Sequence, residues 1–334
     1  MTHFKTFFLS CLLALAAFPA TAEGADFTVD GFDYSITSTT SLTVEVVSGP
    51  NQAVVTIPSS VVFKNRTFRV TGISYDAFQN YTKLRSVDMP SITYIQDGYY
   101  NRYDGRPKGA FTGCSNLSDV NMPVATSIGD YAFSGCNALA SISLPAATTI
   151  DYGAFSDCNS LTSVSLPAAT SIGDYAFQDC EALTSVSLPV ATTIGYYAFS
   201  DCSSLCDIYV GDQPARCSDD TFSKITYATT TLHVPVGCAS KYKAARTWNN
   251  FAFISEDYDP TGIKSTKVND VKICTDNGSV QLTGLKEGEK VLFYSLDGKL
   301  IGAQKANSGT ISITTSEPVV ICKMGGKSIK ILVK

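Results

Sequence analysis

A repeat of 22 residues constrains this chain more than any other feature. The phrase Ser-Ile-Gly-Asp-Tyr-Ala-Phe occupies residues 127–133 and 171–177, and close variants occupy 149–155 and 193–199. Three columns of identical residues keep the same spacing: Phe111, Phe133, Phe155, Phe177 and Phe199; Cys114, Cys136, Cys158, Cys180 and Cys202; Leu117, Leu139, Leu161, Leu183 and Leu205. Repeats with a fixed short period indicate units that stack side by side, so the sequence predicts a solenoid.

Each unit contains one segment that is typical of a short strand. In Leu161-x-x-Val164-x-Leu166 apolar and small polar residues alternate, and Pro167, which has no amide hydrogen, ends the strand. One unit cannot fold alone, because its few large apolar side chains stabilise it much less than ordering its 22 residues costs. We therefore expect neighbouring units to share one core and one ladder of strand hydrogen bonds.

This strand segment, joined to I-G-x-x-A-F-x-x-C, resembles the repeat of the BspA-like family of bacterial surface leucine-rich-repeat proteins, over about residues 26–255. The resemblance implies a leucine-rich-repeat solenoid, mainly β with short irregular or helical returns, closed by a β-rich N-terminal cap. Strands of that cap are expected at 42–47, 54–58, 61–63 and 67–70. Trp248, the single tryptophan, is expected to plug the last coil. The family also implies adhesion, including adhesion to extracellular-matrix proteins.

The start of the chain predicts export. Lys5, the apolar run 7–17 and the small residues Ala20-Thr21-Ala22 are typical of a signal peptide. No other stretch is long and apolar enough to span a membrane, so we expect no transmembrane segment. The protein is therefore expected to be exported, either to the cell surface in association with the outer membrane or to the extracellular medium.

The end of the chain predicts a second domain. Residues 266–334 carry ten lysines and six acids, and they contain seven short strand segments with turns at Asp297-Gly298 and Gly325-Gly326, which predicts a small β-sandwich. Residues 291–299 and 320–334 resemble the C-terminal sorting domain of type IX secretion, with Cys322 where such domains carry a tyrosine. The expected divisions are 1–22 signal peptide, 23–71 β-rich N-terminal cap, 72–255 leucine-rich-repeat solenoid with a C-terminal capping coil, 256–265 linker and 266–334 β-sandwich.

Residues that carry catalytic chemistry are scarce. Beyond the predicted signal peptide the only histidine is His233, which lies between apolar residues in a predicted strand and is expected to be structural. The chain contains none of the strings Gly-x-Ser-x-Gly, His-Glu-x-x-His or Gly-x-x-x-x-Gly-Lys-Ser/Thr, so we predict no enzymatic activity and no cofactor. From Gly109 to Ala215 there are ten acids and no lysine or arginine, which excludes binding to a nucleic-acid backbone.

The cysteine and aspartate columns allow alternative interpretations. Stacked coils bring successive cysteines to about 4.7–4.9 Å, within reach of a disulfide, but the column faces the core and we expect free, buried thiols. Better disulfide candidates in an exported protein are Cys217 with Cys238 and Cys274 with Cys322. Three aspartates that precede column cysteines offer oxygen ligands for calcium, but a solvated edge is the expected role and no metal site is predicted. They are Asp157, Asp179 and Asp201.

Two faces offer side chains for binding. The predicted strand face carries serines at 141, 143, 163, 165, 185 and 187, a flat surface suited to contact by shape. Two features are richer in binding side chains: a tyrosine column on another face, and, separately, an eleven-residue insertion, 96–106. Tyrosine and arginine are enriched at binding hot spots, and insertions into a repeat often lie on a binding face. The alternative to a binding role is a purely structural one, in which the insertion is a solvated loop and its aromatic side chains cover the edge of the coil. The candidate binding residues are Tyr99, Tyr100, Arg102, Tyr103 and Arg106 in the insertion and Tyr131, Tyr175, Tyr196 and Tyr197 in the column, with Tyr152 one place off.

Together these patterns favour a non-catalytic exported or cell-surface protein whose solenoid mediates protein–protein interaction or adhesion to host or cell-surface macromolecules. The alternative is a carbohydrate-binding or polysaccharide-handling accessory protein of the cell envelope, which would use tyrosine rings as sugar platforms. The expected partner is thus a protein or glycan macromolecule.

Overall fold

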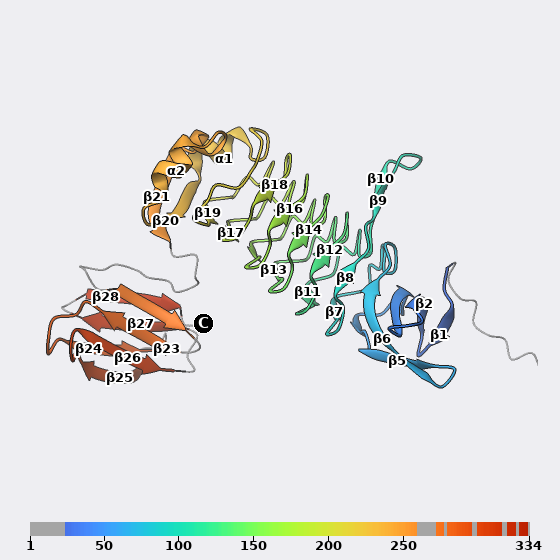
Figure 1. The fold of residues 1–334 in the computed structure, drawn as a ribbon, viewed down its shortest axis with the longest axis horizontal. Helices are drawn as coiled ribbons and strands as arrows, with labels where there is room; N and C mark the ends of the chain where they lie inside the picture. The colour runs from blue at the N-terminus through green and yellow to red at the C-terminus, as the bar shows by residue number, and fades with distance from the viewer. Residues whose placement is uncertain are drawn as a thin grey trace, which may run out of the picture.

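The computed structural model describes residues 24–258 and, further along the chain, 272–276, 279–295, 299–315, 319–324 and 327–332. The predicted signal peptide, the predicted linker from residue 259 onward and the predicted turns at 297–298 and 325–326 lie outside the described residues. Strands dominate the described chain, and its helices are few and short (Figure 1).

A solenoid of parallel strands forms the body of the protein, which confirms the predicted fold class (Figure 1). Each repeat contributes one strand to each of two faces. The first face consists of two-residue strands paired in register, β8 (Tyr94–Ile95), β12 (Ser127–Ile128), β14 (Thr149–Ile150), β16 (Ser171–Ile172) and β18 (Thr193–Ile194). The second face holds β4 (Val54–Thr56), β7 (Ser86–Asp88), β11 (Asp119–Asn121), β13 (Ser141–Ser143), β15 (Ser163–Ser165), β17 (Ser185–Leu188), β19 (Asp207–Val210), β20 (Thr231–Pro235) and β21 (Phe253–Tyr258).

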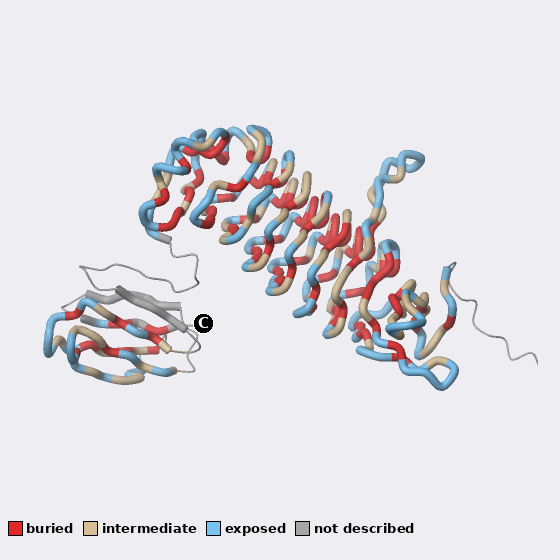
Figure 2. Tube along the Cα trace, in the orientation of Figure 1, coloured by how far each residue is buried: buried red, intermediate tan, exposed pale blue. Residues whose placement is uncertain are grey.

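The phenylalanine column is the centre of the core. Its rings stack with centroids 5.0–5.5 Å apart and planes within 10° of parallel, and the stack includes one more ring at each end than the 22-residue spacing predicts. Buried residues accordingly form a continuous band along the solenoid axis (Figure 2). The rings of the stack are Phe78, Phe111, Phe133, Phe155, Phe177, Phe199 and Phe222.

The cysteine column lies beside this stack as free thiols. All five members are buried, and each Sγ donates a hydrogen bond to a phenylalanine carbonyl of the preceding coil at 3.0–3.3 Å. Burial raises the pKa of each of these thiols. Cys217 and Cys238 are free as well, so the disulfide considered between them is absent. Cys322 is also free, and the side chain of Cys274 lies outside the described residues.

A backbone requirement accounts for the aspartate column. Asp157, Asp179 and Asp201 have φ of 57–59°, and the same position in earlier coils is Gly113 or Gly135 with φ of 72–73°. Only glycine, asparagine and aspartate adopt this left-handed conformation readily. The aspartates are therefore explained by the turn they make.

The N-terminal cap continues the first face of the solenoid. Its strands are β1 (Phe27–Val29), β2 (Phe32–Ser38), β3 (Thr43–Ser48), β5 (Ser60–Phe63) and β6 (Arg66–Ile73), and β6 pairs in parallel with β8. At this junction the Tyr94 hydroxyl and the Gln96 amide donate to the buried Glu45 carboxylate at 3.2 and 2.7 Å. Strand β4, which the sequence analysis placed in the cap, pairs with β7 of the solenoid.

The C-terminal cap closes the other end with aromatic side chains. It holds α1 (Lys224–Thr229), α2 (Ala239–Ala244) and the 3-10 helix η1 (Trp248–Asn250). Trp248 is 1% exposed, and its Nε1 donates to the Ala215 carbonyl at 2.7 Å. Strand β21 pairs with β20 as far as Tyr258, three residues beyond the predicted end of the solenoid at 255.

The C-terminal part forms two antiparallel sheets. One has the order β22-β23-β26 and the other β25-β24-β27-β28, and a small core including Leu282, Phe293 and Cys322 belongs to both. The strands are β22 (Lys272–Asp276), β23 (Ser279–Thr283), β24 (Lys290–Tyr294), β25 (Leu300–Lys305), β26 (Thr310–Thr314), β27 (Val319–Met324) and β28 (Lys327–Leu332). The seven strands among the described residues agree in number with the strand segments expected from the sequence.

Candidate binding surface

The eleven-residue insertion forms a β-hairpin that projects from the side of the solenoid (Figure 1). Strand β9 (Tyr99–Asn101) pairs with β10 (Arg106–Lys108). The hairpin loop is held by its own polar groups, because the Tyr100 hydroxyl donates to the Gly105 carbonyl at 2.9 Å and Lys108 pairs with Asp104 at 3.2 Å.

Most residues of the hairpin are exposed (Figure 2). Tyr99 and Tyr100 are about half-exposed, and Tyr103 at the tip is fully exposed. Arg102 and Arg106 are exposed as well. The structure therefore places all five predicted insertion residues on one protruding element.

The tyrosine column forms a ladder of rings along the solenoid. Tyr131, Tyr152, Tyr175 and Tyr197 follow one another with centroids 5.1–5.2 Å apart. Tyr152 belongs to the ladder although it is one residue out of register. The in-register position is Gly153, where a Cβ would lie only 2.8 Å from the Tyr131 ring. The ring that this coil contributes to the ladder therefore comes from the preceding residue, Tyr152.

Three rings of the ladder are held on strained backbone. Tyr131, Tyr175 and Tyr197 have φ of 55–59°, a left-handed conformation that costs a bulky residue about 1–2 kcal/mol. Such strain persists only where the surrounding structure enforces it, and it is concentrated at functional sites. Three coils carry tyrosine at a position where glycine would be free of strain. This strain indicates that the tyrosine rings themselves serve a purpose at this position.

Tyr196 lies outside the ladder. It occupies the position of Tyr152 and Asp174 in the two preceding coils, and its backbone N–H donates to the Asp174 carboxylate at 2.8 Å. Its side chain is 56% exposed, so it widens the aromatic surface beside Tyr197.

The hairpin and the ladder are continuous. The Gly98 N–H at the base of the hairpin donates to the Asp130 carbonyl at 2.9 Å, next to the first ring of the ladder. Burial, then the hydrogen bond with Tyr152 and the charges of Tyr152, Asp130 and Tyr100, raise the pKa of Tyr131. On the other side of the hairpin, the rings of Tyr75 and Tyr99 lie 5.7 Å apart. We call the insertion tyrosines and arginines together with the four-ring ladder and Tyr196 the tyrosine surface.

Carboxylates line this surface. Asp97 accepts a hydrogen bond from the Asp130 N–H at 3.3 Å, and Asp130 accepts one from the Tyr152 N–H at 2.9 Å. Burial, together with the charge of Asp97, raises the pKa of Asp130. Burial and the charges of Asp97 and Asp130 raise the pKa of Asp151 to about 6. Three carboxylates thus lie close enough to repel one another.

The repeats also match a known family. Residues 55–104 and 106–231 match the BspA type leucine rich repeat region in six copies. The chain belongs to the BspA-type leucine-rich-repeat family. The match ends at residue 231 and does not include the C-terminal β domain of this BspA-type protein. The resemblance of that domain to a type IX sorting domain stays a prediction.

Solved structures of leucine-rich-repeat proteins are similar to this BspA-type chain. One from Bacteroides ovatus is 30% identical with a TM-score of 0.52, and the alignment covers 63% of this chain and 55% of that protein. One from T. pallidum is 24% identical with a TM-score of 0.46, covering 64% and 88%. A leucine rich cell surface protein from Faecalibacterium prausnitzii is 18% identical with a TM-score of 0.32, covering 73% and 98%. None of the curated proteins matches the chain.

The second face of this BspA-type solenoid carries mostly small polar side chains and lacks the aromatic rings of the tyrosine surface over most of its length. Its serines at 141, 143, 163 and 165 are exposed, and those at 185 and 187 are half-buried. Toward the C-terminal cap the same face carries Tyr209 and His233, whose rings stack 4.4 Å apart.

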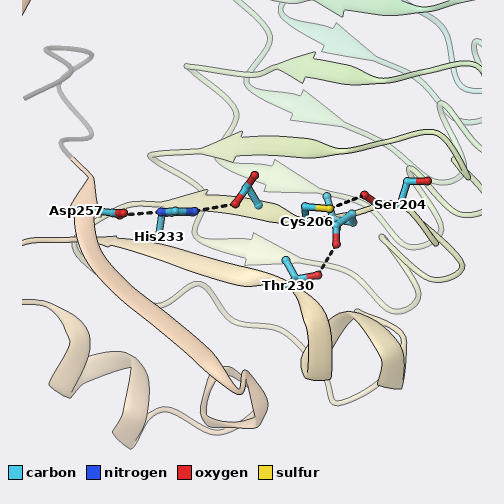
Figure 3. Close-up of polar contacts among 7 residues, drawn as sticks. Ser204, Cys206, Thr230, His233 and Asp257 are labelled. Carbon is cyan, nitrogen blue, oxygen red and sulfur yellow. Dashed lines mark hydrogen bonds and ion pairs between the residues drawn. The ribbon is translucent and has the colours of Figure 1, made fainter. Parts of the chain in front are cut away.

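His233 is occupied by structural contacts. Its Nδ1 lies 2.7 Å from Asp257 Oδ1 on β21, and its Nε2 lies 2.9 Å from Asp207 Oδ1 on β19, so the ring clamps three strands (Figure 3). Neither ring nitrogen is left to activate a nucleophile in this arrangement. Nearby, the Cys206 thiol donates to the Ser204 carbonyl at 3.2 Å and the Thr230 hydroxyl donates to the Leu205 carbonyl (Figure 3).

Within the described part of the chain, no group of three or more histidine, cysteine, aspartate or glutamate side chains is arranged to hold a metal ion. No helix among the described residues has both the length and the apolar character needed to cross a membrane.

Proposed function

We propose that this BspA-type protein is a non-catalytic exported or cell-surface protein that binds another protein through its tyrosine surface. One observation supports the proposal: the base of the exposed hairpin is hydrogen-bonded to Asp130, next to the first ring of the partly exposed ladder, so the two groups of tyrosines adjoin. Tyrosine and arginine supply large contact area at low entropic cost and dominate protein-binding hot spots. Insertions that interrupt a repeat array often lie on its binding face.

Ring packing favours a protein over a sugar as the ligand of the ladder. A sugar platform needs an open ring face, whereas Tyr152 and Tyr175 each have another ring within 5.2 Å on both sides. The ladder therefore offers hydroxyls and ring edges, which suit an irregular protein surface. Fully exposed Tyr103 is the observation that favours the alternative, carbohydrate binding, because nothing in the hairpin covers its ring.

Export is part of the same proposal. The apolar segment and small residues of 1–22 are typical of a signal peptide, and residues 266–334 resemble a type IX sorting domain. Fractionation of producing cells tests both. Recovery of the chain with the outer membrane or in the medium, beginning at Glu23, supports the proposal, and recovery from the cytoplasm overturns it.

The binding test uses the secreted full chain on an immobilised panel of extracellular-matrix proteins beside a glycan array. The hairpin variant Tyr99→Ala/Tyr100→Ala/Arg102→Ala is expected to lose at least about tenfold in affinity for the protein it binds. The matched control, Ser163→Ala/Ser165→Ala on the serine face, is expected to bind as the natural chain does. Unchanged binding by the hairpin variant overturns the site, and binding confined to the glycan array overturns the choice of a protein ligand.

A further inference from the structure

The chemistry of the tyrosine surface narrows the kind of partner it fits. Beside the rings run Asp97, Asp130, Asp151 and Asp174, one or two residues before the ladder position in their coils. Their hydrogen-bond donors are backbone amides and the Ser127 hydroxyl, all of them neutral. Among the described residues, no ion pair within 4 Å involves any of the four.

In the part of the chain that the structure describes, no cation pairs with this group within 4 Å. From Gly109 to Ala215 there is no lysine or arginine, and Lys108 is paired with Asp104 of the hairpin. The two arginines of the tyrosine surface, Arg102 and Arg106, are exposed on the hairpin and form no ion pair with the four aspartates. Burial first, and then the charges of Asp97 and Asp130, raise the pKa of Asp151, so the neighbouring carboxylates repel it. A ligand that brings positive charge relieves this repulsion, whereas an anionic ligand increases it.

We propose that the tyrosine surface docks an arginine-containing basic segment of the partner protein, an inference that rests on the proposed function. Guanidinium groups pair with carboxylates in a planar, two-pronged geometry and pack favourably against open aromatic ring faces. The surface offers carboxylates in successive coils and, outside the ladder, the exposed rings of Tyr103 and Tyr196. Lysine, a compact and strongly hydrated charge, gains less from the rings.

The dimensions of the ladder set the length of such a segment. Three steps of 5.1–5.2 Å separate the Tyr131 ring from the Tyr197 ring, a span of about 15 Å. An extended chain advances about 3.3 Å per residue, so about five residues cover the ladder and a few more reach the hairpin. A peptide of about eight residues is therefore long enough to engage the whole surface.

The test measures fluorescence anisotropy of a labelled peptide of alternating arginine and glycine, about eight residues long, with the secreted full chain. Peptides with lysine or glutamate in place of arginine serve as comparisons. Asp97→Asn/Asp130→Asn/Asp151→Asn is expected to weaken binding of the arginine peptide by at least about tenfold. Asparagine keeps an oxygen for the same backbone amides, and unchanged Trp248 fluorescence verifies the fold.

A matched control removes the same number of charges elsewhere. Asp157→Asn/Asp179→Asn/Asp201→Asn keeps residues that tolerate the left-handed backbone and is expected to bind the arginine peptide within about twofold of the natural chain. Equal losses in the two triple variants would show attraction to net charge alone and overturn the inference. No binding of the arginine peptide, or equal binding of the glutamate peptide, also overturns it.

Failure of this inference is distinguishable from failure of the proposed function. If a matrix protein binds in a hairpin-dependent way while the arginine peptide does not bind, the partner chemistry is wrong and the binding surface stands. If neither binds, both proposals fall.

Discussion

Replacing Asp151 by asparagine is expected to stabilise the solenoid at neutral pH and to have no such effect in acid. Burial first, and then the charges of Asp97 and Asp130, raise the pKa of the Asp151 carboxyl from its usual 3.8 to about 6. The folded protein therefore holds this proton more tightly than the unfolded chain does. The charged carboxylate destabilises the fold above about pH 6, and the destabilisation is lost as the pH falls below the unfolded value of 3.8.

The size of the effect follows from the shift and the exposure. One pKa unit corresponds to about 1.4 kcal/mol, so the shift sets an upper limit of about 3 kcal/mol at neutral pH. Asp151 is partly exposed, and solvent screening reduces the interaction, which leaves an expected gain of about 1 kcal/mol. Asp174→Asn is the matched control, because an asparagine oxygen still accepts the Tyr196 N–H, and no gain is expected there.

Urea unfolding followed by tryptophan fluorescence measures the gain. Trp248 is the single tryptophan and is buried in the C-terminal cap of the solenoid, so its signal reports the solenoid without the C-terminal β domain. The midpoint of Asp151→Asn is expected to exceed that of the natural chain at about pH 7.5 and to equal it near pH 3.5. A gain that is the same at both pH values, or a loss at neutral pH, would refute the electrostatic reasoning.

Three further predictions follow from the core and the cap. Phe155→Ala removes a ring that packs between two others at 5.2 and 5.3 Å, and it is expected to cost about 3–5 kcal/mol in urea unfolding; a cost below about 1 kcal/mol would contradict the stacked core. Exposed Cys206 is expected to be alkylated in the native protein while buried Cys158 reacts only after unfolding, and a Cys136–Cys158 linked peptide in non-reducing mass spectrometry would refute the free ladder. His233→Ala removes the clamp on three strands and is expected to cost about 1 kcal/mol without any effect on the tyrosine surface; an unchanged unfolding midpoint would show that the clamp contributes nothing.

Column spacing was enough to predict the interior of the solenoid. A residue that recurs every 22 positions must meet its own copy in the next coil, so the burial of Phe133 or Cys158 follows from the repeat alone. The same argument placed the serine-rich strands on one face, and β15 lies where the alternation of Val164 with small polar residues predicted it. The two-residue strands of the first face went unpredicted, because a segment as short as Ser171–Ile172 carries no alternation to recognise.

The tyrosine surface was only partly predictable. Tyr152 joins the ladder in place of Gly153, where a Cβ would lie only 2.8 Å from the Tyr131 ring, and a column of identical residues does not reveal such an exchange between neighbouring positions. Contact between the hairpin and Asp130 depends on how the insertion leaves β8, which composition does not determine. The aspartate column had a readable signal, since glycine at 113 and 135 is replaced by aspartate at 157, 179 and 201, a substitution typical of a left-handed turn.

The central claim is that the hairpin and the ladder form one protein-binding surface, and radical footprinting of tyrosine side chains tests it most directly. The full chain is oxidised alone and when saturated with the matrix protein that it binds most tightly. Oxidation of Tyr99, Tyr100, Tyr103 and Tyr152 is expected to fall in the complex, while Tyr209 on the serine-rich face is oxidised as before. Protection of Tyr209 with no change at the hairpin and the ladder would contradict the claim.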